Sequence, residues 1–139
     1  GELAYLTATS VNDCFYWIPT HIALGRGLGL TEEKMRHLTD SPLPDGIYTE
    51  TEAAIIRYAQ KSTRLEPIDE LTYGNLERHF SKEQIIDICL TVGYSNMVNR
   101  FHATFLTDID EKTLAEVETG NQQTGICPIP LPKIPVVPN

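Results

Sequence analysis

The stretch NDCFYWIPTH, residues 12–21, places a thiol, an indole and an imidazole close together in the sequence. A cysteine attacks as its thiolate, and the free amides and dipole at the start of a helix stabilise that charge. Asp13 is a typical N-cap residue, so Cys14 is expected in the first helical turn, although the Asp13 carboxylate partly cancels the field. Free cysteines are also among the most buried residues. Cys14 is therefore either a reactive sulfur or a small core residue.

His21 is the second candidate for chemistry, and its distance from Cys14 depends on Pro19. In a regular helix seven residues span about 10 Å, so the imidazole contacts Trp17, four residues earlier, rather than the thiol. Pro19 removes a backbone hydrogen bond and clashes with the preceding turn. The helix therefore begins later, near Trp17, or bends at Pro19, and a bend would bring the thiol and the imidazole closer. The plain alternative is that His21 is a packed, hydrogen-bonded residue.

The rest of the sequence predicts the helices that must position these residues. Thr49 with Glu52, and Ser81 with Gln84, have the spacing of a capping box at a helix start. Gly27 and Gly29 are stop signals. No stretch shows sustained alternation of polar and apolar residues, so no sheet is expected. The fold class is all-α, with helices at about 2–11, 13–26, 31–38, 49–60, 67–80 and 82–106.

The C-terminal part has a different composition. Residues 110–118 could form one more short helix, but CPIPLPKIPVVPN cannot continue it, because its five prolines lack amide donors and have a fixed φ. The sequence thus predicts a helical domain over residues 1–119 and a Pro-rich tail over residues 120–139. We expect the tail to be extended, disordered or a strap across a partner subunit.

Composition excludes several classes of function. The chain has 139 residues and a formal net charge of −8, which disfavours nucleic acid as a partner. Every apolar run is too short to span a membrane. Three cysteines, an odd number, without a signal-peptide pattern favour a reducing compartment, so we expect a cytoplasmic protein. No histidine or cysteine pair has metal-site spacing, so neither a metal nor another cofactor is predicted.

At the level of whole motifs, ELAYLTATSVNDCFYWIPTH resembles the active-site helix pair of the AhpD-like and carboxymuconolactone decarboxylase superfamily. In that superfamily a glutamate is followed twelve residues later by Cys-x-x-Cys-x-x-x-His. Glu2, Cys14 and His21 match this pattern, and Trp17 occupies the position of the second cysteine. The resemblance covers about residues 2–106. It implies an AhpD-like helical domain, assembly into a homo-oligomer and a small-molecule substrate.

The resemblance leaves three hypotheses open for function. A hydroperoxidase-type oxidoreductase would use Cys14 alone, with a Glu2/His21 proton relay and an external thiol as reductant, because Trp17 removes the second thiol. A cofactor-free decarboxylase acting on a small lactone acid would use Glu2 and His21 as acid and base, with Trp17 as a pocket wall. The third hypothesis is a non-catalytic, ligand-binding oligomer.

Asn99, Arg100 and Cys89, all on the last predicted helix, are further candidates for the site. Asn99 and Arg100 look like a polar pair common in the family, and with Trp17 they are candidates for the substrate pocket. The plainer interpretation, hydrogen bonds that join one helix to another, is favoured for Asn99 and Arg100. Cys89 could serve as a distant resolving thiol, but its apolar neighbours on the last helix predict a buried core residue.

Overall fold

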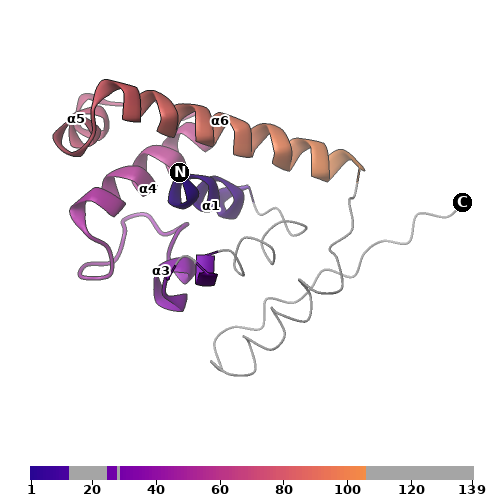
Figure 1. Cartoon of the computed structure of the whole chain (residues 1–139), viewed down its shortest axis with the longest axis horizontal. Coiled ribbons are helices and arrows are strands. Elements are labelled where there is room, and N and C mark those ends of the chain that lie inside the picture. Colours follow the sequence, from indigo (N-terminus) through magenta and orange to yellow (C-terminus); the bar gives the residue numbers. More distant parts are fainter. Residues whose placement is uncertain (13–24, 28, 106–139) are drawn as a thin grey trace, which may run out of the picture.

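The computed structural model describes residues 1–12, 25–27 and 29–105, and in these ranges every regular element is an α-helix (Figure 1). This agrees with the predicted all-α class. The helices, in chain order, are α1 (Glu2–Val11), α3 (Glu32–Arg36), α4 (Glu50–Thr63), α5 (Glu70–His79) and α6 (Lys82–Phe105). The predicted helix over residues 13–26 lies outside the described residues except for 25–27, which are helical. The predicted helix over 110–118 and the Pro-rich tail also lie outside them.

Local signals in the sequence set the helix starts. The Thr49 side chain accepts from the Glu52 amide at 3.1 Å, and the Glu52 carboxylate accepts from the Thr49 amide at 3.0 Å, which completes a capping box at α4. Ser81 and Gln84 make the same reciprocal pair before α6. Both predicted boxes are confirmed.

A glycine ends the helical turn at residues 25–27, as predicted. Gly29 has a φ of 81°, which is the left-handed region that glycine adopts without strain. The Gly29 amide donates to the Arg26 carbonyl and the Leu30 amide donates to the Gly25 carbonyl. These two bonds form a Schellman motif and direct the chain into α3.

The core forms where α1 packs between α4 and α6 (Figure 1). Ala4 and Ala8 on α1 let the helices approach closely, and both are buried against α4 and α6. The main cluster consists of Ala4, Ala8, Ala54, Tyr58, Ala59, Leu76, Ile85, Ile88 and Val92. A second cluster lies on the α3 side and consists of Leu6, Leu38, Leu43, Ala53 and Ile56.

One buried side chain ties α4 to the loop after α3. The Gln60 amide group donates to the carbonyls of Leu38, at 2.7 Å, and Asp40, at 3.0 Å. A buried amide without such partners would destabilise the fold. Gln60 therefore fixes the position of the loop that follows α3.

No described helix combines the length and the apolar composition needed to cross a membrane. The helix predicted over residues 67–80 is observed as α5, Glu70–His79, and its leucines differ in burial. Leu76 is fully buried, but Leu71 is 69% exposed.

Candidate functional site

Glu2, the predicted acid, lies in the first turn of α1 and is exposed. A carboxylate is favoured at this position because the helix N-terminus carries partial positive charge. Glu2 lines an open groove of about 580 Å³ between α1 and the middle of α6. The groove is lined by Gly1, Glu2, Tyr5, Asp87, Leu90, Thr91 and Tyr94. It therefore combines two carboxylates with two tyrosine rings, and the rings of Tyr5 and Tyr94 lie 6.0 Å apart.

The other end of α1 is held by a chain of side-chain amides. Asn12, the C-cap of α1, donates through Nδ2 to Oδ1 of Asn96 at 2.9 Å. Asn96 in turn donates to the hydroxyl of Thr63 on α4 at 3.2 Å. Three helices thus meet at the residue that comes two positions before Cys14.

Gly25, the first described residue after the segment that holds the remaining predicted residues, packs closely against its neighbours. Gly25 is buried, and a Cβ added to it would lie 2.9 Å from Sδ of Met35 and 3.4 Å from a methyl group of Leu6. The packing of Met35 and Leu6 against residue 25 thus leaves little space for a Cβ, and a larger residue there would displace the Met35 side chain. Cys14, Trp17 and His21 lie outside the described residues.

Asn99 and Arg100 are adjacent in sequence but occupy different environments. Asn99 is buried between α1 and α6, where Oδ1 accepts from the Thr9 hydroxyl at 3.4 Å and Nδ2 donates to the Ser95 hydroxyl at 3.4 Å. Arg100 is exposed and donates to the Asn96 carbonyl of its own helix at 3.0 Å. Among the described residues, neither lines the groove at Glu2.

The interpretation of Asn99 as a residue that joins one helix to another agrees with these bonds, but sequence reasoning did not identify its buried partners Thr9 and Ser95. The hydroxyls of Thr9 and Ser95 lie 3.1 Å apart, and Ser95 also donates to the Tyr5 carbonyl at 3.2 Å. Thr9 and Ser95 are completely buried. The sequence feature that could have identified Ser95 is its spacing from Asn99. Two polar residues at i and i+4 share one face of a helix, and on the inner face of a long helix they indicate a contact with another helix.

The prediction for Cys89 is wrong: the residue is exposed on α6. Ile85 and Ile88 point into the core, and Cys89 lies at the edge of this buried face. Its side chain contacts Tyr58 of α4. Burial, together with a hydrogen bond to Cys89, raises the pKa of Tyr58 to about 12.

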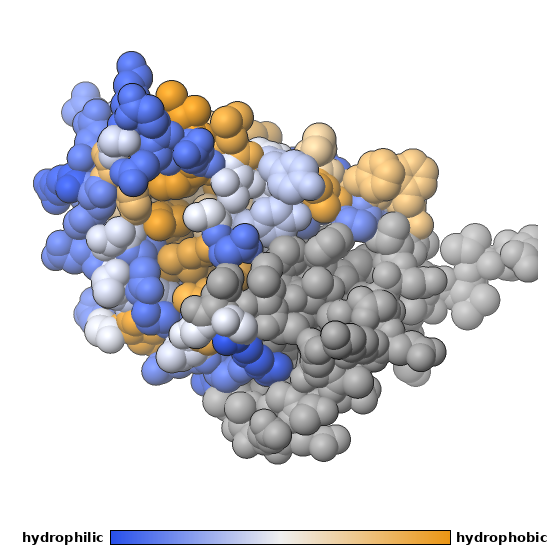
Figure 2. All heavy atoms as spheres, in the orientation of Figure 1, coloured by the Kyte–Doolittle hydropathy of each residue, from blue (hydrophilic) through white to orange (hydrophobic). Residues whose placement is uncertain are grey.

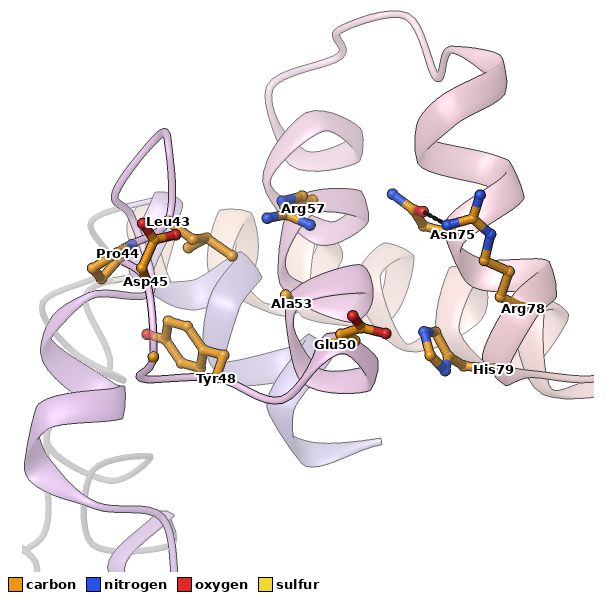
Figure 3. Close-up of a pocket in the computed structure, with 11 residues that line it drawn as sticks. Leu43, Pro44, Asp45, Tyr48, Glu50, Ala53, Arg57, Asn75, Arg78 and His79 are labelled. Carbon is orange, nitrogen blue, oxygen red and sulfur yellow. Dashed lines mark hydrogen bonds between the residues drawn. The ribbon is translucent and has the colours of Figure 1, made fainter.

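A second hollow, of about 280 Å³, lies between the loop before α4 and helices α4 and α5 (Figure 3). Arg57 comes from α4, and Arg78 with Asn75 comes from α5, where Arg78 donates to Asn75 Oδ1 at 3.3 Å. Asp45 and Glu50 also line this hollow, so its two guanidinium groups are offset by two carboxylates. None of the residues predicted for the site lies here. The described residues also hold no group of three His, Cys, Asp or Glu side chains that could bind a metal.

The chain matches no protein-family model, and no curated protein matches it. Among solved structures it is similar to a protein of unknown function from Agrobacterium tumefaciens, described there as a proposed AhpD antioxidant defence protein. The TM-score is 0.71 and the identity is 26%, over 79% of this chain and 77% of the other. The all-helical architecture and this similarity agree with the resemblance carried by Glu2 and its surrounding motif. The chain therefore has an AhpD-like fold.

Proposed function

We propose that the protein is a thiol-dependent hydroperoxide reductase that uses Cys14 as its single reactive sulfur. The observation that carries this proposal is the AhpD-like fold, with Glu2 in the first turn of α1 and lining a groove against α6. The antioxidant role proposed for the A. tumefaciens protein supports the same chemistry. The match of Glu2, Cys14 and His21 to the family motif supplies the residues.

The proposed reaction is balanced with one protein thiol and two external thiols. The Cys14 thiolate attacks the terminal oxygen of a hydroperoxide, the O–O bond breaks, and an alcohol leaves after Glu2 and His21 relay a proton to it. Cys14 is then a sulfenic acid. One external thiol condenses with it and releases water, and a second external thiol reduces the mixed disulfide. The sum is hydroperoxide plus two thiols to alcohol, water and one external disulfide.

The test measures consumption of an organic hydroperoxide in the presence of excess dithiol. The wild type should turn over, and Cys14→Ser should not. Cys89→Ser is the matched control, because Cys89 is an exposed cysteine outside the proposed site, and it should retain full activity. Mass spectrometry should find sulfenic acid or a mixed disulfide on Cys14. Glu2→Gln should lower turnover about a hundredfold if Glu2 assists proton transfer.

The second candidate function is cofactor-free proton transfer on a small lactone acid. Trp17, at the position of the second cysteine, favours this alternative, because proton transfer needs no thiol pair. It predicts activity that is lost in Glu2→Gln and kept in Cys14→Ser. Unoxidised Cys14 together with no peroxide consumption would refute the reductase and leave this candidate or a binding role.

A further inference from the structure

The hollow between the loop before α4 and helices α4 and α5 is lined by four charged side chains of both signs. Arg57 and Arg78 carry the positive charges, and Asp45 and Glu50 carry the negative charges. Hydrophilic residues prevail at this end of the molecule, which holds α5 and the beginning of α4 and lies at the left of Figure 2. The hollow shares no lining residue with the groove at Glu2.

The fold does not use these four charges to hold itself together. Asp45, Glu50 and Arg57 form no side-chain hydrogen bond or ion pair within the described part of the chain. Arg78 donates to Oδ1 of Asn75, which is a neutral group. Charges of both signs thus line one hollow without neutralising each other through direct contact, and all four remain free to bind a ligand.

The backbone that carries the charges is held in place by local interactions. The capping box at Thr49 fixes the first turn of α4, which includes Glu50. Gly46 has a φ of 78°, a left-handed conformation that suits glycine, and it turns the loop directly after Asp45. The buried side chain of Leu43 anchors the same loop in the core. The hollow is therefore formed before a ligand binds, which lowers the cost of ordering it.

The positive side of the hollow has the donors that a carboxylate requires. In the view of Figure 3, Asn75 lies between Arg57 and Arg78. Because Oδ1 of Asn75 accepts from Arg78, its Nδ2 is left to donate. A guanidinium group presents paired N–H donors that match the two oxygens of a carboxylate, and bonds between charged groups are the stronger ones.

We propose that this hollow binds a small amino acid, with its carboxylate at Arg57 and Arg78 and its ammonium group at Glu50 and Asp45. A plain anion would be attracted by the two guanidinium groups but repelled by the two carboxylates, and a plain cation would meet the reverse. A ligand with both charges is attracted by both pairs. The hollow of about 280 Å³ is at the lower end of the range for small-molecule pockets, which suits a ligand of this size. The site does not depend on the chemistry proposed for Cys14.

The test titrates the isotope-labelled full chain with L-alanine and with γ-aminobutyrate, and follows the Nε–H signals of arginine by nuclear magnetic resonance. The signals of Arg57 and Arg78 should shift and saturate with at least one of the two amino acids, with a Kd of about 1 mM or below. Butyrate and butylamine, which each carry a single charge, should bind at least about tenfold more weakly. Arg57→Gln and Glu50→Gln should each raise the Kd of the amino acid about tenfold, because each removes one charge-assisted bond.

Arg64→Gln and Glu66→Gln are the matched controls, because both residues are exposed after the end of α4 and outside the hollow. They remove the same charges and should leave the Kd unchanged. Circular dichroism should show the same helix content in all four variants. The proposal would be overturned by the absence of a saturable shift with either amino acid, or by controls that weaken binding as much as Arg57→Gln and Glu50→Gln do. Butyrate that binds as tightly as the amino acids would also overturn it, and would indicate a plain anion site.

Discussion

Nδ2 of Asn12 donates to Oδ1 of Asn96 at 2.9 Å, which joins the C-cap of α1 to the middle of α6. The two residues are far apart in sequence, and Asn96 also reaches Thr63 on α4. This contact fixes the point at which the chain leaves α1 and continues toward Cys14. Asn96 therefore anchors the C-terminal end of α1 to α4 and α6.

Asn96→Ala is expected to lower the free energy of unfolding by about 1–2 kcal/mol, because it removes two hydrogen bonds between helices. Urea denaturation measures this loss. Asn75→Ala is the control: within the described part of the chain Asn75 accepts only from Arg78 on the same helix, and the cost should stay within about 0.5 kcal/mol. Equal losses in the two variants would contradict a special role for the Asn12–Asn96 contact.

Asn99→Ala separates the two interpretations of Asn99. If Asn99 joins α1 to α6, the substitution leaves the buried hydroxyls of Thr9 and Ser95 short of a partner, and unfolding becomes about 2–3 kcal/mol easier. If Asn99 contacts substrate, KM rises and stability is nearly unchanged. Arg100→Ala is the neighbouring control and should alter stability by less than about 0.5 kcal/mol, because Arg100 is exposed.

Sequence patterns predicted the features of this fold that depend on local geometry. A capping box needs only two residues at a fixed spacing, so Thr49 with Glu52 and Ser81 with Gln84 could be recognised without a tertiary model. The turn at Gly29 was recognisable for the same reason, since a positive φ there favours glycine. The all-α class follows from several such local signals in succession.

Burial on α6 could not be predicted in the same way. Cys89 lies among apolar residues in sequence, but this helix is apolar on two opposite sides, and periodicity alone does not say which side faces the core. Ile85 and Ile88 are buried, whereas Leu90 is exposed. The groove at Glu2 could not be predicted from the sequence either, because the packing of α6 on α1 is what brings Asp87 and Tyr94 to it.

The ion pair between Lys34 and Glu52 makes stability depend on pH. Nζ of Lys34 lies 2.8 Å from both oxygens of Glu52, and each side chain is only 23% exposed. Burial alone would raise the pKa of Glu52, but the bonds from Lys34 and Thr49 outweigh it and hold the pKa below its ordinary value of 4.5. The pair therefore stabilises the fold above that pH, and this stabilisation is lost as the pH falls through the lowered pKa.

Glu52→Gln is expected to cost about 1 kcal/mol at pH 7, because glutamine keeps the capping box but loses the ion pair. The difference from wild type should shrink as the pH falls below 4.5. Chemical denaturation at a series of pH values measures it. Glu66→Gln is the control, since Glu66 is exposed and makes no side-chain bond within the described residues, so it should show little cost at any pH. A cost for Glu52→Gln that is the same at pH 3 and pH 7 would contradict the ionic origin.

Leu65→Gly is expected to stabilise the protein, although it removes a large side chain. Leu65 follows the C-cap of α4 with a φ of 56°, and it is 86% exposed. The Leu65 amide donates to Ser62 and the Glu66 amide donates to Lys61, which is a Schellman motif with leucine at the position that usually holds glycine. The left-handed conformation costs a residue with a Cβ about 1–2 kcal/mol, and the substitution by glycine removes this strain. Part of the resulting gain in stability is offset by the greater freedom of glycine in the unfolded chain. We expect a net gain of about 0.5–1 kcal/mol, measured as a rise in Tm of roughly 2–4 °C.

Leu71→Gly is the control, because Leu71 is an exposed leucine inside α5, and it should lower stability by about 1 kcal/mol. A loss of stability in both variants would show that the backbone at Leu65 is not strained.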